Sequence, residues 1–79
     1  MQITEKSLQL FLAYANDAGN WSGTPLVGGN IAQTPEDNGN LTQLKKAELL
    51  KTEDDGEGNI WIYFTEAGKT LALEHGVEI

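Results

Sequence analysis

The stretch EDDGEGNIWIYFTEAG, residues 53–68, decides the fold of this chain. It places four carboxylates and two glycines directly before a run of five apolar residues. Acidic segments that contain glycine favour tight turns, and the residues around this one alternate with a period of two. The stretch therefore predicts a β-hairpin, with strands at residues 51–53 and 59–65.

Successive side chains of a strand point to opposite faces. Three residues of the second predicted strand should face the core: Ile60, Ile62 and Phe64. Trp61 and Tyr63 should then face outward. Two interpretations of these aromatic residues stay open: they pack beneath Trp21 and the loop at residues 20–30, or they anchor a protein partner.

A calcium loop is an alternative interpretation of the acidic turn. If Gly58 takes position 6 of an EF-hand, carboxylates occupy the first three ligand positions, but Phe64 stands at position 12. An EF-hand needs a bidentate glutamate there, and a helix rather than a strand after the loop. We therefore expect no dedicated metal site and no cofactor.

The length of 79 residues predicts a single domain over residues 1–79, with one modest core. The chain has no cysteine, so disulfides and thiolate zinc sites are excluded. Its first residues lack the basic region of a signal peptide, and Asn16 and Asp17 interrupt the apolar stretch that follows. The sequence thus predicts a cytoplasmic protein without a membrane partner.

Residues 4–18 carry the spacing of an amphipathic helix, with Thr4 as N-cap and Gly19 just past the end. Its apolar stripe consists of Leu8, Phe11, Leu12 and Ala15, widened by Leu10 and Tyr14. Such a stripe fits a core position or a dimer interface. Residues 20–30 should be loop, with Leu26 folding back onto the core. A phosphate-binding loop from Gly23 to Gly28 lacks the required lysine.

A second helix start lies at Thr34, followed by proline and, three residues on, by the carboxylate of Asp37. The best-supported helix is residues 40–50, and it either continues from Thr34 through Gly39 or starts afresh. Its inward residues should be Leu41, Leu44 and Leu49, and its outward residues Gln43, Lys45 and Lys46.

The last helix should start at Thr65, with Ala67, Leu71 and His75 on its inner face and Gly76 at its end. His75 is the sole histidine, and no serine or cysteine nucleophile accompanies it. The carboxylates of the turn should stay solvated and ionised, which does not suit acid–base catalysis. We therefore expect no enzymatic activity.

The net charge of −7 opposes binding to nucleic acid, and all five basic residues are lysines. Lys45, Lys46 and Lys51, joined by Lys69, are the available cations. They form either the solvated face of a helix or a local basic patch.

The segment LTQLKKAELLKTEDDGEGNIWIYFTEAG, residues 41–68, resembles the second half of a winged helix-turn-helix domain of MarR-type bacterial regulators. Leu44, Leu49 and Leu50 match the leucine-rich end of the recognition helix, and residues 54–59 match the wing tip. Residues 64–68, FTEAG, match the start of the following helix. The resemblance implies a small winged-helix-like α+β domain of about three helices and a two- or three-stranded antiparallel wing hairpin.

Two departures from this family concern the surfaces that would contact DNA. The start of the recognition helix carries Glu36 and Asp37, and the wing tip is acidic. In addition, Glu48 replaces the glycine that usually ends the helix. DNA recognition would rest on six residues: Asn38, Asn40, Thr42, Gln43, Lys45 and Lys46.

Two functions follow as hypotheses. The first is a regulatory or interaction module whose acidic surface binds a protein with a basic face, as an accessory or inhibitor of a mobile element would. Its contact residues would be Glu53, Asp54, Asp55, Glu57, Trp61 and Tyr63. The second is a small, dimeric DNA-binding transcription regulator that uses helix 40–50 and the wing.

Overall fold

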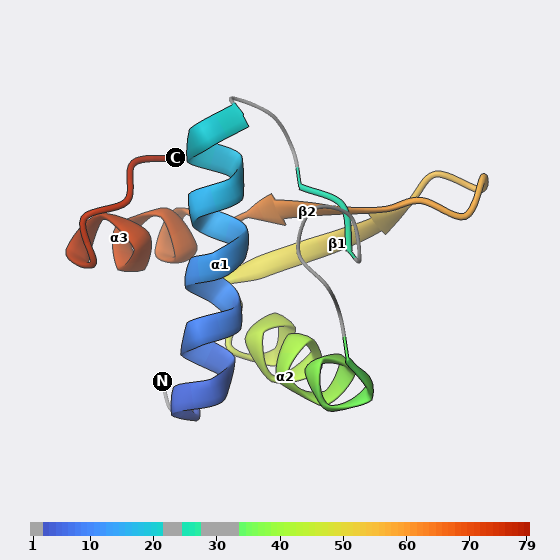
Figure 1. The fold of residues 1–79 in the computed structure, drawn as a ribbon, viewed down its shortest axis with the longest axis horizontal. Coiled ribbons are helices and arrows are strands. Elements are labelled where there is room, and N and C mark those ends of the chain that lie inside the picture. Colours follow the sequence, from blue (N-terminus) through green and yellow to red (C-terminus); the bar gives the residue numbers. More distant parts are fainter. Residues whose placement is uncertain (1–2, 22–24, 28–33) are drawn as a thin grey trace.

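The computed structural model describes residues 3–21, 25–27 and 34–79. Its elements in chain order are α1 (Glu5–Trp21), α2 (Pro35–Lys46), β1 (Leu50–Asp54), β2 (Ile60–Phe64) and α3 (Glu66–Glu74). The predicted α+β domain of three helices and an antiparallel hairpin is confirmed. Helix α1 crosses the base of the hairpin, and the tip of the hairpin projects away from the helices (Figure 1).

The hairpin, here called the wing, is residues 50–64. Its strands pair antiparallel, with Leu50 opposite Phe64 and Asp54 opposite Ile60. A further short segment, residues 25–27, lies along the other edge of β2, where the amide of Val27 donates to the Ile60 carbonyl at 2.8 Å. The predicted loop at residues 20–30 therefore contributes backbone pairing to the sheet.

The core forms where α1 meets α2, α3 and the base of the wing. Its buried apolar residues are Leu10, Phe11, Tyr14, Ala15, Leu41, Leu44, Leu49, Leu50, Ile62 and Ala72. The rings of Phe11 and Phe64 meet edge to face, with centroids 5.6 Å apart. Ile60 was predicted to face the core, but it is 38% exposed, because it lies near the tip of the wing.

Helix α1 begins as predicted, with the Ser7 amide donating to the Thr4 hydroxyl at 3.1 Å. Its end was predicted at residue 18, just before Gly19, but it continues to Trp21. The Glu78 carbonyl oxygen would lie 3.2 Å from a Cβ on Gly19, so glycine here lets the C-terminal residues pack against the helix. The predicted packing of the Trp21 side chain and the Gly23–Gly28 spacing lie outside what the structure describes.

Helix α2 starts with the predicted cap. The Asp37 amide donates to the Thr34 hydroxyl and the Thr34 amide to the Asp37 carboxylate, which forms a capping box. The helix runs through Gly39 and ends at Lys46, so the predicted end at residue 50 is wrong. Leu49 is buried after the helix rather than in it.

Helix α2 ends in a turn at Glu48. The φ of Glu48 is +60°, the left-handed conformation in which helices commonly terminate. The amide of Glu48 donates to the Lys45 carbonyl, and the amide of Leu49 donates to the Leu44 carbonyl. These two bonds form a Schellman motif, with the buried pair Leu44 and Leu49 as its hydrophobic contact.

Helix α3 is locked to this turn at its start. The Thr65 hydroxyl accepts from the Gly68 amide and donates to the Glu48 carbonyl at 2.6 Å. A Cβ on Gly68 would overlap the Leu49 carbonyl oxygen. The close approach buries Gly68 and Ala72, so the predicted inward positions Ala67 and His75 are wrong and both are exposed.

Residues 22–34 separate α1 from α2, whereas a helix-turn-helix pair is joined by a turn of about three or four residues. No helix pair of that kind occurs within residues 3–21, 25–27 and 34–79. Helix α2 does lead directly into the hairpin, as a recognition helix leads into a wing. The shape thus fits a winged helix at α2, the wing and α3.

Candidate functional site

The tip of the wing is a turn built by glycine and aspartate. Gly56 and Gly58 have φ of +81° and +87°, which side chains of L-residues rarely adopt. The Asp54 carboxylate accepts from the Gly56 amide at 2.8 Å. The glycines and the aspartate of this sequence therefore have a structural role, because they form the turn.

Asp55 holds the tip together. One of its carboxylate oxygens accepts from the amides of Glu57 at 2.8 Å and Asn59 at 3.3 Å. The other accepts from the Asn59 side-chain amide and from the Trp61 indole N–H, both at 3.1 Å. The bond from the Glu57 amide is the main cause that lowers the pKa of Asp55, and the Asn59 and Trp61 side chains lower it further. Asp55 is thus a structural carboxylate within the predicted binding set.

The other three acidic residues of the predicted set lie at the end of β1 and in the turn. Glu53, Asp54 and Glu57 are exposed. Within the described residues, no lysine lies within ion-pair distance of these three carboxylates. The ion pair found there joins Lys6 to Glu36, at 3.8 Å. The wing therefore presents a concentration of negative charge at and beside its hydrogen-bonded turn.

The two aromatic residues of the set differ in exposure. Tyr63 is 45% exposed and lies opposite Lys51 across the hairpin. Trp61 is half-buried, lies opposite Glu53, and its backbone pairs with Leu26. Its indole is oriented by Asp55. Tyr63 is therefore the more accessible of the two aromatic residues.

The neighbouring segment corrects a prediction for the loop. Leu26 was expected to fold back onto the core, but Val27 is the residue of this segment that packs against it.

Two of the six predicted DNA-reading residues face α1. Asn40 accepts from the buried Ser7 hydroxyl at 3.1 Å, and its side-chain amide donates to Asp37. Gln43, predicted to point outward, accepts from the Thr4 amide at 2.7 Å. Both side chains therefore connect α2 to the start of α1, a role that helical periodicity on its own does not reveal.

The other four DNA-reading candidates are exposed: Asn38, Thr42, Lys45 and Lys46. The Thr42 hydroxyl donates to the Asn38 carbonyl, one helical turn back. These residues share the outer side of α2, which faces away from the core. Two of the four, Lys45 and Lys46, are cations that could contact a phosphate backbone.

The surface between α2, β1 and α3 is mixed in charge. Lys45 and Lys51 line a hollow there together with Glu48 and Glu66. Two lysines and two glutamates cancel, so the predicted lysine patch does not form a strongly positive surface at this place. Lys69 lies beyond it, on α3.

The described residues contain neither a metal-binding cluster nor a membrane-spanning helix. No group of three or more histidine, cysteine, aspartate or glutamate side chains there is arranged to hold a metal ion. No helix of that part is long and apolar enough to cross a membrane.

One surface feature was missed by the sequence analysis. Leu73 is 60% exposed, the most exposed large apolar residue of the part that the structure describes. The sequence could have predicted this exposure, because Leu73 follows the inward-facing Leu71 by two residues. Residues two apart lie on nearly opposite sides of a helix. Leu73 lines a groove between α3 and residues 77–79.

Protein-family models, curated proteins and solved structures were compared with the chain, and none of them matches it.

Proposed function

We propose that this protein is a non-enzymatic interaction module whose acidic wing binds a protein partner with a basic surface. The observation that carries the proposal is the tip of the wing. Glu53 and Asp54 at the end of β1 and Glu57 in the turn are exposed, and no lysine of the described residues lies within ion-pair distance of them. Asp55 holds the turn with hydrogen bonds.

Rigidity and charge together favour protein recognition. A turn already held by internal hydrogen bonds loses little conformational entropy on binding. Complementary charges speed association and fix the orientation of partners. Tyr63 adds an accessible aromatic side chain on the outer face of the same hairpin. A partner that meets the wing would therefore combine lysine or arginine with an apolar pocket.

The same surface disfavours DNA. Binding to a phosphate backbone gains affinity by releasing counterions to protein cations, and each exposed carboxylate near the contact opposes it. A basic protein surface that normally holds nucleic acid is, in contrast, complementary to the wing. This proposed role suits an accessory or inhibitor of a mobile element.

The test separates the wing from the rest of the acidic surface. One variant neutralises the wing: Glu53→Gln, Asp54→Asn and Glu57→Gln. The matched control removes the same charge elsewhere: Glu5→Gln, Glu66→Gln and Glu74→Gln. The partner captured by the wild-type protein is purified, and its affinity for each variant is measured by calorimetry.

We expect the wing variant to bind at least about tenfold more weakly and the control to bind within about twofold of wild type. Equal losses in the two variants, or no loss in either, would contradict a contact through the wing.

A second candidate function is DNA binding by α2 and the wing. It is favoured by the position of α2 directly before the hairpin, with Lys45 and Lys46 exposed on its outer side. In this case the protein would retard random duplex DNA at about 50 mM salt, and a Lys45→Glu, Lys46→Glu variant would lose the shift. That pair of results would replace the first proposal.

A further inference from the structure

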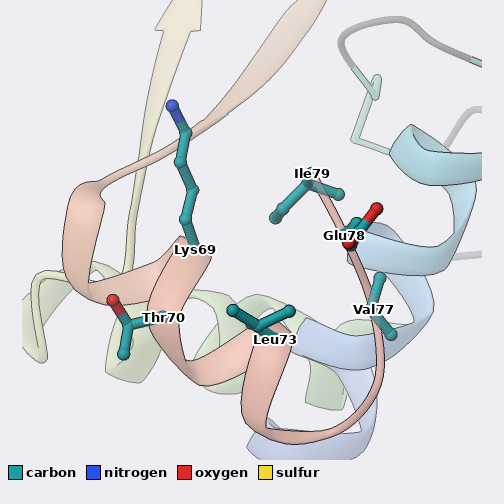
Figure 2. Close-up of a pocket in the computed structure, with 6 residues that line it drawn as sticks. All are labelled: Lys69, Thr70, Leu73, Val77, Glu78 and Ile79. Carbon is teal, nitrogen blue, oxygen red and sulfur yellow. The ribbon is translucent and has the colours of Figure 1, made fainter.

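A groove runs between the outer side of α3 and residues 77–79, on the side of the molecule opposite the tip of the wing (Figures 1 and 2). Its lining residues are Lys69, Thr70, Leu73, Val77, Glu78 and Ile79. Leu73 lies between the two walls, and the side chains of Val77 and Ile79 stand on the opposite side from α3 (Figure 2).

The groove is a fixed part of the fold. Gly76, with φ of +81°, reverses the chain after α3. The amides of Gly76 and Val77 donate to the carbonyls of Leu73 and Ala72, both at 2.9 Å, which forms a second Schellman motif. Beyond it, the Glu78 carbonyl approaches Gly19 of α1. Residues 77–79, the wall opposite α3, are therefore fixed by hydrogen bonds to the end of α3 and packed against α1.

The floor and one wall of the groove are apolar and partly open to water. Leu73 is 60% exposed. Val77 and Ile79 are partly buried, because they also pack against the core. One exposed leucine needs no explanation in a soluble protein. A leucine that adjoins two further apolar side chains in a concave surface is instead typical of a contact site.

Charge decides what kind of partner fits. Lys69 on α3 and Glu78 on the facing wall are the two charged residues among those that line the groove, and they cancel. The whole chain has a formal charge of −7. A basic partner would therefore be drawn to other surfaces, such as the wing, whereas two copies of the chain can meet here with little charge repulsion.

We propose that this groove is a self-association site, in which a second copy of the chain docks by two-fold symmetry. In a two-fold interface the same patch faces itself, so Leu73 of each copy lies opposite the groove of the other. The opposite charges on the two walls are self-complementary in this arrangement, because Lys69 of one copy faces Glu78 of the next.

The dimer should be weak. A stable interface buries about 800 Å² on each partner. That is about a sixth of the 5041 Å² surface of this chain, more than a groove lined by six residues covers. Association should therefore be visible at about 10 µM to 1 mM protein. The proposed function of the wing does not depend on it.

Sedimentation velocity over this concentration range tests the proposal. We expect wild-type protein to shift from monomer toward dimer, and Leu73→Ser to raise the dissociation constant at least about tenfold. Ile60→Ser is the matched control, because Ile60 is a large apolar residue exposed on the wing. It should leave the dissociation constant unchanged, and circular dichroism would show that both variants are folded.

A charge exchange tests the geometry. Lys69→Glu and Glu78→Lys should each weaken the dimer about threefold to tenfold, and the double variant should restore it to within about twofold of wild type. A monomer throughout the concentration range would overturn the proposal. So would a dimer that is insensitive to Leu73→Ser, or a double variant no better than the single ones.

Discussion

Replacing Glu48 with glycine should make this protein more stable. Glu48 ends α2 in the left-handed conformation, with φ of +60°, and is the one non-glycine residue of the described ranges with positive φ. Its side chain is exposed, and its carboxylate has no hydrogen-bond or ion-pair partner in that part of the chain. The change therefore removes a strained Cβ without removing a contact.

The size of the effect follows from two opposing terms. An L-residue pays about 1–2 kcal/mol to adopt the left-handed conformation, and glycine avoids this cost. Glycine gives up about 0.5–1 kcal/mol through the greater freedom of the unfolded chain. The free energy of unfolding should therefore rise by about 0.5–1 kcal/mol, which corresponds to about 2–8 °C in Tm for a domain of this size.

Urea unfolding at fixed temperature, followed by circular dichroism, measures this difference. Glu48→Ala is the matched control, because it removes the same charge but keeps the Cβ. The midpoint should rise for Glu48→Gly at unchanged m-value, and Glu48→Ala should stay at or below the wild-type midpoint. A glycine variant that is no more stable than the alanine variant would refute the assignment of strain to this backbone.

Three further changes have outcomes that the structure specifies. Gly39→Ala should raise the free energy of unfolding by about 0.5–1 kcal/mol, because Gly39 lies inside α2 and a Cβ there meets no atom within 4 Å; a lower urea midpoint would contradict this. Gly68→Ala should lower it by more than about 2 kcal/mol, since the Cβ would collide with the Leu49 backbone, and a variant of wild-type Tm would show that α3 can move away without loss. Asp55→Asn should destabilise the protein at pH 7. Because folding lowers the pKa of Asp55 below its ordinary value of 3.8, the stability that its charge contributes is present above that pH and is lost as the pH falls through the folded pKa. Urea midpoints of wild type and variant should accordingly converge toward pH 2, and a constant difference between pH 7 and pH 2 would exclude the charge as the cause.

The hairpin and the helix starts were predictable because their signals are local. Alternation in residues 59–65 and the glycines of the turn specify a hairpin without reference to the rest of the chain. Capping is equally local, so Thr4, Thr34 and Thr65 marked the starts of the three helices. In each case the sequence signal lies within a few residues of the turn or cap that it specifies.

The helix ends and the inward faces were less predictable. The leucines at residues 49 and 50 extend the helical pattern, but Glu48 turns the chain before them. The turn is favoured because Leu49 then becomes buried against Leu44 and its carbonyl accepts from the Thr65 amide. The bond from Thr65 depends on the start of α3 being in place, and a local sequence pattern does not specify that.

The candidate site shows the same division. Its acidic character and the positions of Glu53, Asp54 and Glu57 on the hairpin tip could be derived from the sequence. The use of Asp55 inside the tip could not, because it depends on the turn bringing the Trp61 indole to its carboxylate.

The sequence by itself determined the classes of element, their order and the concentration of negative charge at one turn, since these follow from composition and short-range periodicity. The tertiary structure decided which polar residues of α2 face α1, how closely α3 approaches the end of α2, and that Leu73 lies in an open groove. These features depend on contacts between segments far apart in the chain. Their free energy is gained when the elements pack together, and it therefore selects among arrangements that are locally equivalent.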